Sequence, residues 1–259
     1  MEVIILPSSK EIGALAADSI EALVRNKPNA VIGLATGSSP LPIYDELARR
    51  HEAGLSFEGV SGFALDEYVG LPVGHYESYR EVIRREFTNR VDVSPENVHG
   101  PDGASYDVAA ACQSYEDAIA AAGGIDLQIL GVGTNGHIGF NEPGSSLASR
   151  TRIKTLAEQT RQDNARFFDN IDQVPHHVVT QGLGTIMDAR HLVLVAFGAG
   201  KADAVRDFVE GPLSASCPAS ILQFHPRATV IIDEAAASKL AGAASYRHAY
   251  ENKPAWQGV

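Results

Sequence analysis

The sequence predicts a three-layer α/β fold: a single domain over residues 1–259, in which a mostly parallel open sheet has helices on both faces. Three observations support this prediction. Short apolar runs alternate with segments whose apolar residues recur at helical spacing. The runs are apolar along most of their length, which is typical of parallel strands covered on both faces. No repeat divides the chain, nor does any linker rich in proline, glycine and serine.

The predicted strands are mostly apolar and are bounded by polar or turn residues. They cover EVIILP (2–7), AVIGLAT (30–36), SGFALDE (61–67), IDLQILGVG (125–133), HLVLVAFG (191–198) and ATVIIDE (228–234). The predicted helices have apolar residues three or four positions apart, as in Ile12, Leu15, Ala16, Ile20 and Leu23. They cover 9–26, 42–54, 78–89, 107–124 and 201–211. Gly54 and the pair Gly123–Gly124 suit helix C-termini.

Residues 134–180 depart from this alternation, because they are polar and weakly periodic. Long irregular segments of compact domains are usually functional loops or lids, and we expect a lid at about residues 156–176. In an open α/β sheet, ligands bind beyond the carboxyl ends of the strands. The residues that follow AVIGLAT, SGFAL, IDLQIL and HLVLVAF are therefore the candidates for a functional site.

Composition and charge exclude several classes of protein. Hydrophobic residues make up 44% and charged residues 20%, as in soluble globular chains, and the net charge of −11 argues against a nucleic-acid partner. No apolar stretch approaches the roughly 20 residues that cross a bilayer, and the N-terminus lacks the basic lead of a signal peptide. Cys112 and Cys217 show no metal-binding spacing, and they favour buried thiols in a reducing, cytoplasmic compartment.

Two strand ends carry groups that suit a bound anion. The loop after AVIGLAT consists of Thr36, Gly37, Ser38 and Ser39. Its hydroxyls and backbone N–H groups precede a proline that opens a helix, so they form a candidate anion cradle, with an ordinary helix cap as the alternative. Lys201 would lie in the first helical turn after HLVLVAF, where the helix dipole disfavours a cation unless an anion binds between them. A solvated surface lysine is the alternative there.

The predicted strand at 61–67 ends in two carboxylates, Asp66 and Glu67. A carboxylate at the end of an apolar strand is costly unless it has a function or a partner. In a partly desolvated cleft its pKa rises, and it can act as a general base on a carbon acid. A helix cap, a turn cap or an ion pair is the alternative.

The strand IDLQIL leads into GVGTNGHIGFNEP (131–143), whose first six residues match the dinucleotide fingerprint G-x-G-x-x-G. A dinucleotide loop must open into a helix that holds the pyrophosphate, whereas Pro143 interrupts any helix soon after the last glycine. We therefore expect no dinucleotide. This strand end presents Asn135, His137 and Glu142, and a histidine oriented by a carboxylate is an acid–base pair that works near neutral pH. A purely structural histidine is the alternative.

Six motifs in order resemble those of glucosamine-6-phosphate deaminases: ATGSSP, LDEYVGL, GVGTNGHIGFNEP, SLASRTRIKTL, ARFFDN and VTQGLGTIMDA. The resemblance runs from about Val3 to Glu234. The related 6-phosphogluconolactonases share the Rossmann-like fold and the phosphate loop, but not DEYVGL or the GFNEP run. The resemblance implies an enzyme of amino-sugar catabolism that converts glucosamine 6-phosphate and water to fructose 6-phosphate and ammonium, without a metal or an organic cofactor.

The resemblance also implies roles for individual residues. Asp66 would take the C2 proton of the opened sugar and return it at C1 through an enolamine, and hydrolysis at C2 would then release ammonia. His137, supported by Asn135 and Glu142, would open the pyranose ring by moving the anomeric hydroxyl proton to the ring oxygen. Many members carry aspartate where this chain has Asn135. A neutral amide orients an imidazole but does not stabilise its cation, so we expect Asn135→Asp to move the acid limb of the pH–rate profile.

The substrate phosphate would bind to the Thr36–Ser39 loop, to Lys201 and to Arg166, which lies on the predicted lid. The phosphate takes no part in the reaction, so its binding energy can position the sugar. Two other functions remain as alternatives. One is a deaminase or isomerase of another amino-sugar phosphate, such as galactosamine 6-phosphate. The other is a sugar-phosphate sensor, because this fold also forms effector domains of bacterial transcription regulators; the acid–base residues and the acidic charge disfavour it.

Some hexameric members are activated by N-acetylglucosamine 6-phosphate at a subunit interface. Ser145, Arg152 and Lys154 match residues of that allosteric site, although the same SLASRTRIKT run occurs in members without allostery. The C-terminal run SYRHAYENKPAWQGV gives no firm match to the allosteric pattern. The resemblance therefore makes a homo-oligomer possible and leaves regulation open.

Overall fold

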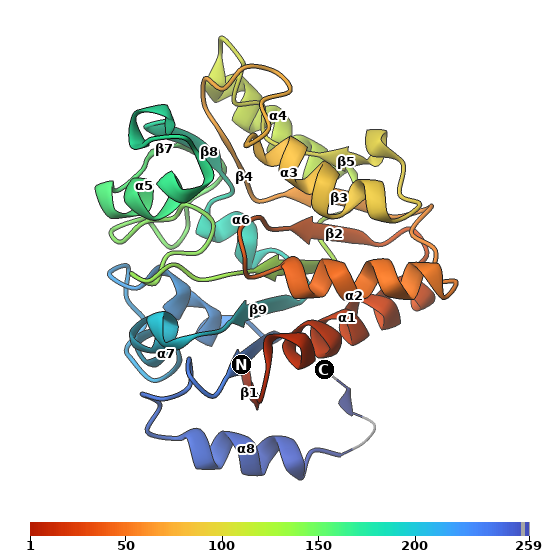
Figure 1. The fold of residues 1–259 in the computed structure, drawn as a ribbon, viewed down its shortest axis with the longest axis vertical. Coiled ribbons are helices and arrows are strands. Elements are labelled where there is room, and N and C mark those ends of the chain that lie inside the picture. The colour runs from red at the N-terminus through yellow and green to blue at the C-terminus, as the bar shows by residue number, and fades with distance from the viewer. Residues whose placement is uncertain (255–256, 259) are drawn as a thin grey trace.

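The structure, a computed structural model, describes residues 1–254 and 257–258, so Ala255, Trp256 and Val259 of the C-terminal run lie outside the described residues. Across the described residues, seven strands form a central parallel sheet in the order β1-β10-β9-β6-β2-β3-β5 (Figure 1). They are β1 (Glu2–Leu6), β2 (Val31–Leu34), β3 (Ser61–Ala64), β5 (Val98–His99), β6 (Leu127–Leu130), β9 (Leu192–Ala196) and β10 (Ala228–Asp233). The predicted parallel sheet is confirmed, and β5 is a short edge strand that the sequence did not predict.

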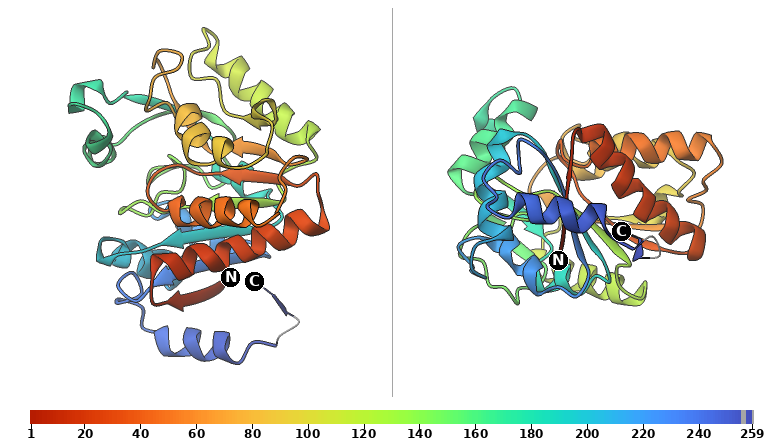
Figure 2. Two further views of the ribbon diagram at one scale, coloured as in Figure 1. Left: turned by 45° about the vertical axis from the view of Figure 1, so that its right-hand side comes forward. Right: turned by 90° about the horizontal axis from the view of Figure 1, so that it is seen from below.

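Helices cover both faces of this sheet, as predicted. α1 (Ser9–Asn26) and α2 (Leu41–Glu52) lie side by side on one face, and α4 (Val108–Ala121) lies on the other (Figure 2). The Ser8 hydroxyl caps α1 by accepting from the backbone N–H of Glu11, and α1 buries the apolar stripe that its spacing predicts. The other helices are α3 (Tyr79–Glu86), α5 (Glu158–Asn164), α6 (Leu183–Met187), α7 (Ala202–Val209) and α8 (Ala243–Glu251). Among the described residues, no helix is long and apolar enough to cross a membrane.

A second, smaller sheet lies beside the carboxyl ends of the parallel strands. Its strands β4 (Asp66–Tyr68), β8 (His177–Thr180) and β7 (Arg152–Thr155) are antiparallel and run in the order β4-β8-β7. The strand predicted at 61–67 is thus divided at Leu65, so that β3 belongs to one sheet and β4 to the other. The segment 134–180, which the sequence marks as irregular, contains two strands of the small sheet together with α5. Figure 1 shows these elements grouped around the strand ends.

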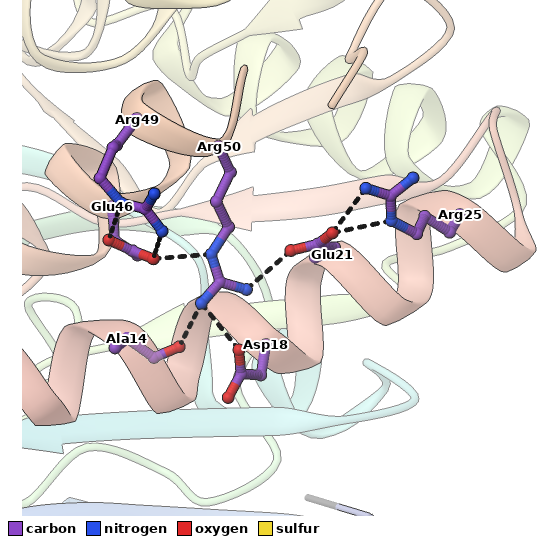
Figure 3. Close-up of polar contacts among 7 residues, drawn as sticks. All are labelled: Ala14, Asp18, Glu21, Arg25, Glu46, Arg49 and Arg50. Carbon is purple, nitrogen blue, oxygen red and sulfur yellow. Dashed lines mark hydrogen bonds and ion pairs between the residues drawn. The ribbon is translucent and has the colours of Figure 1, made fainter. Parts of the chain in front are cut away.

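An ion network joins α1 to α2 near the end of α2 that faces away from those strand ends (Figure 3). Arg50 of α2 contacts Glu21 at 2.8 Å and Asp18 at 2.7 Å, both on α1, and donates to the carbonyl oxygen of Ala14 at 3.1 Å. Its Nε also contacts Glu46, one turn earlier on α2, at 2.8 Å. Only 12% of the Arg50 side chain is exposed, so these charges are partly shielded from water. The network stabilises the packing of the two helices.

Candidate active site

A cavity of about 830 Å³ opens at the carboxyl ends of the parallel strands. The predicted residues among its lining are the Thr36–Ser39 loop, Asp66, His137, Arg166 and Lys201. A second cavity, of about 570 Å³, lies between α8 and the β1–β10 edge and contains none of the predicted residues. Across residues 1–254 and 257–258, no group of three histidine, cysteine or carboxylate side chains is placed to hold a metal ion.

Asp66, the first residue of β4, is buried beneath this cavity with 5% of its surface exposed. In the part of the chain that the structure describes, no group donates a hydrogen bond to its carboxylate, so the cap and the ion pair that were its alternatives are not found. Burial raises the pKa of Asp66 well above its ordinary value, and the neighbouring Glu67 raises it further. A desolvated carboxylate without hydrogen bonds is a stronger base than one in water.

Glu67 has the opposite environment, because successive strand residues point to opposite faces. Its carboxylate accepts from the backbone N–H groups of Tyr68 at 2.8 Å, Tyr79 at 2.9 Å and Arg80 at 3.0 Å. Two of these N–H groups belong to the first turn of α3, so Glu67 caps that helix. Of the two adjacent carboxylates, Glu67 holds the backbone and Asp66 faces the cavity.

His137 belongs to a hydrogen-bonded relay on the loop after β6. Its Nδ1 lies 2.8 Å from Asn135 Oδ1, and Asn135 Nδ2 donates to Glu142 Oε2 at 2.8 Å. Because a carboxylate only accepts hydrogen bonds, the Asn135 NH2 group must point to Glu142 and the Asn135 oxygen must point to His137. That amide oxygen is also only an acceptor, so Nδ1 of the neutral imidazole must carry the proton. The other ring nitrogen, Nε2, is left as an acceptor on a ring that lines the cavity. The structure thus brings together the three residues that the sequence singled out on this loop.

Glu142 completes the relay from below the cavity, with 6% of its surface exposed. Its Oε2 lies 3.5 Å from His137 Nδ1. Burial alone would raise the pKa of Glu142, but the hydrogen bond and charge of His137, together with hydrogen bonds from Thr160 and Asn135, lower it to about 2. Glu142 is therefore ionised throughout the neutral range and supports positive charge on the imidazole.

The glycines of GVGTNG serve the relay rather than a pyrophosphate. A Cβ on Gly133 would lie 2.2 Å from Cε1 of the His137 ring, so only glycine lets the imidazole pack against the strand end. Gly136 has φ +83°, and its N–H closes a turn on the Gly133 carbonyl. No helix follows this loop within residues 131–150, so the structure agrees with the rejection of the dinucleotide fingerprint.

The Thr36–Ser39 loop joins β2 to α2 at the rim of the cavity. α2 has Pro40 as its N-cap residue, and within the described chain no side chain caps it, so the serines are not the ordinary caps of the alternative interpretation. Tyr44 fixes the start of the loop, since its hydroxyl pairs with both the carbonyl and the N–H of Ala35. The loop residues and Leu41, the first residue of α2, thus line the cavity together.

Two cations, Lys201 and Arg166, also line the cavity. Lys201 is half-buried and its Nζ donates to the carbonyl oxygen of Val132 at 2.7 Å, so it is not the solvated lysine of the alternative. Burial lowers its pKa, and the charge of Arg166 acts in the same direction while Asp163 opposes them. Arg166 is exposed, and its guanidinium lies 4.7 Å from the centre of the Phe167 ring. The two positive charges make this side of the cavity favourable for an anion.

Several cavity contacts come from residues that the sequence did not single out. Thr160 of α5 donates to Glu142, and Asn164 of the same helix donates to the Tyr68 hydroxyl at 3.0 Å. Tyr79 lines the cavity and stacks on Phe140, with ring centres 5.9 Å apart. These contacts join segments far apart in the chain, and no local pattern marked them.

The three residues matched to an allosteric site lie around the small sheet. Arg152 and Lys154 are two positions apart on β7 and therefore share a face. Arg152 Nη1 donates to the side-chain oxygen of Asn141 at 2.8 Å, and burial lowers its pKa. The Ser145 hydroxyl is buried and has no hydrogen-bond partner among the described residues. Among the described residues, no hydrogen bond or ion pair connects Ser145 to Arg152 or Lys154.

Comparisons with known proteins agree with this geometry. A protein of Arthrobacter sp. (strain FB24) named glucosamine-6-phosphate deaminase is 74% identical over 100% of both chains, and one of Mycolicibacterium smegmatis with the same name is 63% identical over 100% of both. A solved structure described as a monomeric glucosamine-6-phosphate deaminase is 42% identical, with a TM-score of 0.91 over 92% of this chain and 100% of its own. A 6-phosphogluconolactonase from Trypanosoma cruzi, 20% identical, shares the fold with a TM-score of 0.75 over 93% of this chain and 97% of its own.

The family described as glucosamine-6-phosphate isomerases/6-phosphogluconolactonase matches residues 8–231, which is most of the chain. The match covers strands β2, β3, β5, β6 and β9, the Thr36–Ser39 loop after β2 and the candidate residues at the strand ends. The chain therefore belongs to the family of glucosamine-6-phosphate isomerases and 6-phosphogluconolactonases.

Proposed function

We propose that the protein converts glucosamine 6-phosphate and water to fructose 6-phosphate and ammonium. One observation carries the proposal: a single cavity contains an unpaired, buried carboxylate at Asp66 and, from another strand end, the His137 relay. A 2-amino aldose needs both groups, because its C2 proton is barely acidic until the ring opens to an aldehyde. Relatives named glucosamine-6-phosphate deaminase, at up to 74% identity over the full chain, support the same reaction.

His137 opens the pyranose in the first step. Its unprotonated Nε2 takes the proton of the anomeric hydroxyl and delivers it to the ring oxygen, as the C1–O5 bond breaks and the C1 carbonyl forms. The imidazolium that exists between these two transfers is stabilised by the Glu142 carboxylate, 3.5 Å from Nδ1. Asn135 holds the ring so that the proton stays on Nδ1.

Asp66 carries out the second step on the opened sugar. Its carboxylate takes the proton from C2, and the electron pair forms a C1–C2 double bond while the C1–O π bond breaks. O1 receives that π pair and takes a proton from the substrate's own ammonium group, which gives an enolamine. The same carboxyl group then returns the C2 proton to C1, and the nitrogen lone pair forms a C–N double bond, which leaves an iminium ion at C2. Water adds to C2, the C–N bond breaks and ammonium leaves. The desolvation that raises the pKa of Asp66 increases its strength as a base for this step.

The phosphate anchors the substrate between these two groups. In the proposed mode of binding the phosphate accepts hydrogen bonds from the Thr36–Ser39 loop and forms ion pairs with Lys201 and Arg166. Arg166 belongs to the proposed lid, residues 156–176, which covers the cavity once the phosphate is bound. We also propose that residues 1–259 act as one catalytic domain, because the anchor, the base and the relay come from strand ends of one sheet and its neighbour.

Release of ammonia from glucosamine 6-phosphate tests the proposal, with galactosamine 6-phosphate as the comparison substrate. Turnover of glucosamine 6-phosphate is expected, and absence of turnover of either sugar would refute the deaminase assignment. The role of Asp66 is tested in deuterated water. Wild-type protein should place deuterium at C1 of fructose 6-phosphate, and Asp66→Asn should not; continued incorporation would remove Asp66 from its role as base.

Assembly, regulation and location remain predictions with their own tests. Light scattering of the purified protein tests whether it forms a homo-oligomer. The competing outcome is a monomer, because the related solved structure is described as monomeric. An effector site at Ser145, Arg152 and Lys154 predicts that N-acetylglucosamine 6-phosphate changes the substrate dependence of the rate. A cytoplasmic location is consistent with the free thiols of Cys112 and Cys217, and fractionation of cells tests it.

A further inference from the structure

Helix α5 contacts the carboxylate of the relay directly. Thr160 is buried, with 4% of its surface exposed, and its Oγ1 donates to Glu142 Oε1 at 2.5 Å. The other carboxylate oxygen, Oε2, accepts from Asn135 and faces His137. The two oxygens of Glu142 are therefore divided between two elements, with one oxygen held by α5 and the other supplied to the relay.

The same helix also reaches the strand that carries Asp66. Asn164 lies one turn after Thr160, on the same side of α5, and its amide donates to the hydroxyl of Tyr68 on β4. Tyr68 is two residues after Asp66 and packs against Tyr79 and Phe140 in the wall of the site. One face of α5 thus contacts both Glu142 of the His137 relay and β4, the strand that carries Asp66.

A third contact fixes α5 to the chain that follows it. Arg161 is buried and donates through Nη2 to the carbonyl oxygens of Ile171 at 3.0 Å and Val174 at 3.2 Å. These bonds connect α5 to residues 171–174, near the end of the segment 156–176, so that the two parts of this segment are held as one unit. The position of Thr160 is thereby set by the whole segment rather than by a single flexible side chain.

We propose that Thr160 is a positioning residue for the relay: by holding Glu142 Oε1, it presents Oε2 to Asn135 and His137 whenever α5 is seated on the site. The inference rests on the proposed function, since it concerns the ring-opening step. The terminal torsion of a glutamate is broad, so a carboxylate held on one side only turns freely about it. Without the Thr160 hydroxyl, Oε1 keeps only the long contact from the backbone N–H of Ala157, at 3.5 Å, and the carboxylate turns away from the imidazole to recover a stronger partner.

The test uses Thr160→Val in the full-length protein, because valine keeps the shape of threonine and removes the hydroxyl. The expected result is a fall in kcat of about 10-fold to 100-fold, the effect of losing one hydrogen bond to a charged group, with little change in KM. Thr160→Ser keeps a hydroxyl and should restore most of the rate. Thr155→Val is the matched control, since Thr155 is an exposed threonine of β7, and its rate should equal that of the wild type.

Substrate deuterated at C2 shows which step the substitution slows. If Thr160 serves ring opening, the substitution slows that step, and removal of the C2 proton then limits the rate less than it does in the wild type. The isotope effect on kcat in Thr160→Val should therefore be no larger than in the wild type. A larger isotope effect would place the defect at Asp66 and overturn the inference. Equal rates for wild type and Thr160→Val would overturn it as well.

The controls separate this inference from the proposed function and from misfolding. A wild-type protein that releases no ammonia refutes the proposed function, whereas an active wild type with an unaffected Thr160→Val refutes only the role of Thr160. Circular dichroism establishes that each variant is folded. Should Thr160→Val fail to fold, Thr160→Ala and Thr160→Ser are compared: a slow alanine variant beside a fast serine variant supports the inference, and equal rates overturn it.

Discussion

Asp66→Asn should make the protein more stable at neutral pH while it abolishes turnover. The Asp66 carboxylate is 5% exposed, accepts no hydrogen bond within the described chain and has its pKa raised by burial, so its ionised form is destabilising in the folded state. Leaving a buried polar group unsatisfied costs about 1–3 kcal/mol, and more for a charge. Removing the charge should therefore raise the unfolding free energy by about 1–3 kcal/mol, and the melting temperature by about 2–4 °C for each kcal/mol.

The pH dependence of this gain is its diagnostic feature. A carboxyl group with a raised folded-state pKa contributes stability at acidic pH and loses it as pH rises through that pKa. Thermal unfolding followed by circular dichroism should show the variant above the wild type at neutral pH, with the gap closing as the pH falls into the ordinary carboxyl range. A variant that is no more stable than the wild type at neutral pH would refute the reasoning.

Asp92→Asn is the matched control, because it should behave in the opposite way. Asp92 accepts from the Ser56 hydroxyl at 2.6 Å and from the backbone N–H of Phe57 at 2.5 Å. Burial would raise its pKa, but these bonds and the charge of His51 leave the pKa below its ordinary value. Asp92→Asn should therefore lower the melting temperature at neutral pH, and the loss should shrink as pH falls through the folded-state pKa.

Three other predictions concern separate parts of the molecule. Lys201→Met should lower kcat/KM for glucosamine 6-phosphate about 100-fold, through the loss of a charge-assisted phosphate contact, and an unchanged value would remove Lys201 from the anion site. Asn135→Asp places a second carboxylate beside the imidazole, so the acid limb of the pH–rate profile should move to higher pH; an unmoved limb would contradict the effect of the amide. Arg50→Ala should lower the unfolding free energy in urea by about 1–2 kcal/mol with kcat unchanged, and a stability equal to that of the wild type would show that the α1–α2 network contributes nothing.

Local pattern identified the elements whose residues are apolar without interruption. β9 is buried at every position, and β10 at all but the last, so their sequences alone located them. β7 gave no such signal, because Arg152 and Lys154 alternate with exposed residues. It is a strand because β8 lies alongside it, and this long-range pairing is invisible in a window of a few residues.

The residues of the site likewise divide into those that a local pattern marks and those that only long-range contacts bring together. The rule that ligands bind beyond strand ends led to Asp66 and His137, because both follow apolar runs. It did not distinguish Asp66 from Glu67, two adjacent carboxylates whose roles are set by the face of the strand on which each lies. Thr160 carried no signal at all, since one threonine in a polar segment acquires its role only when α5 folds over Glu142.

The small antiparallel sheet has a consequence for the order in which the molecule folds. β4 holds Asp66 and pairs with β8, which is synthesised far later in the chain. Loop closure over such a separation carries an entropic cost that must be met before the pairing is gained. A nascent chain that ends before His177 can therefore assemble β2, β3, β5 and β6 while its future base still lies on an unpaired strand. Competence for proton transfer is acquired only once β8 has joined β4, after the part of the core built on β2, β3 and β6. Substitutions in β8 far from the substrate should therefore delay the appearance of activity more than the appearance of helical structure.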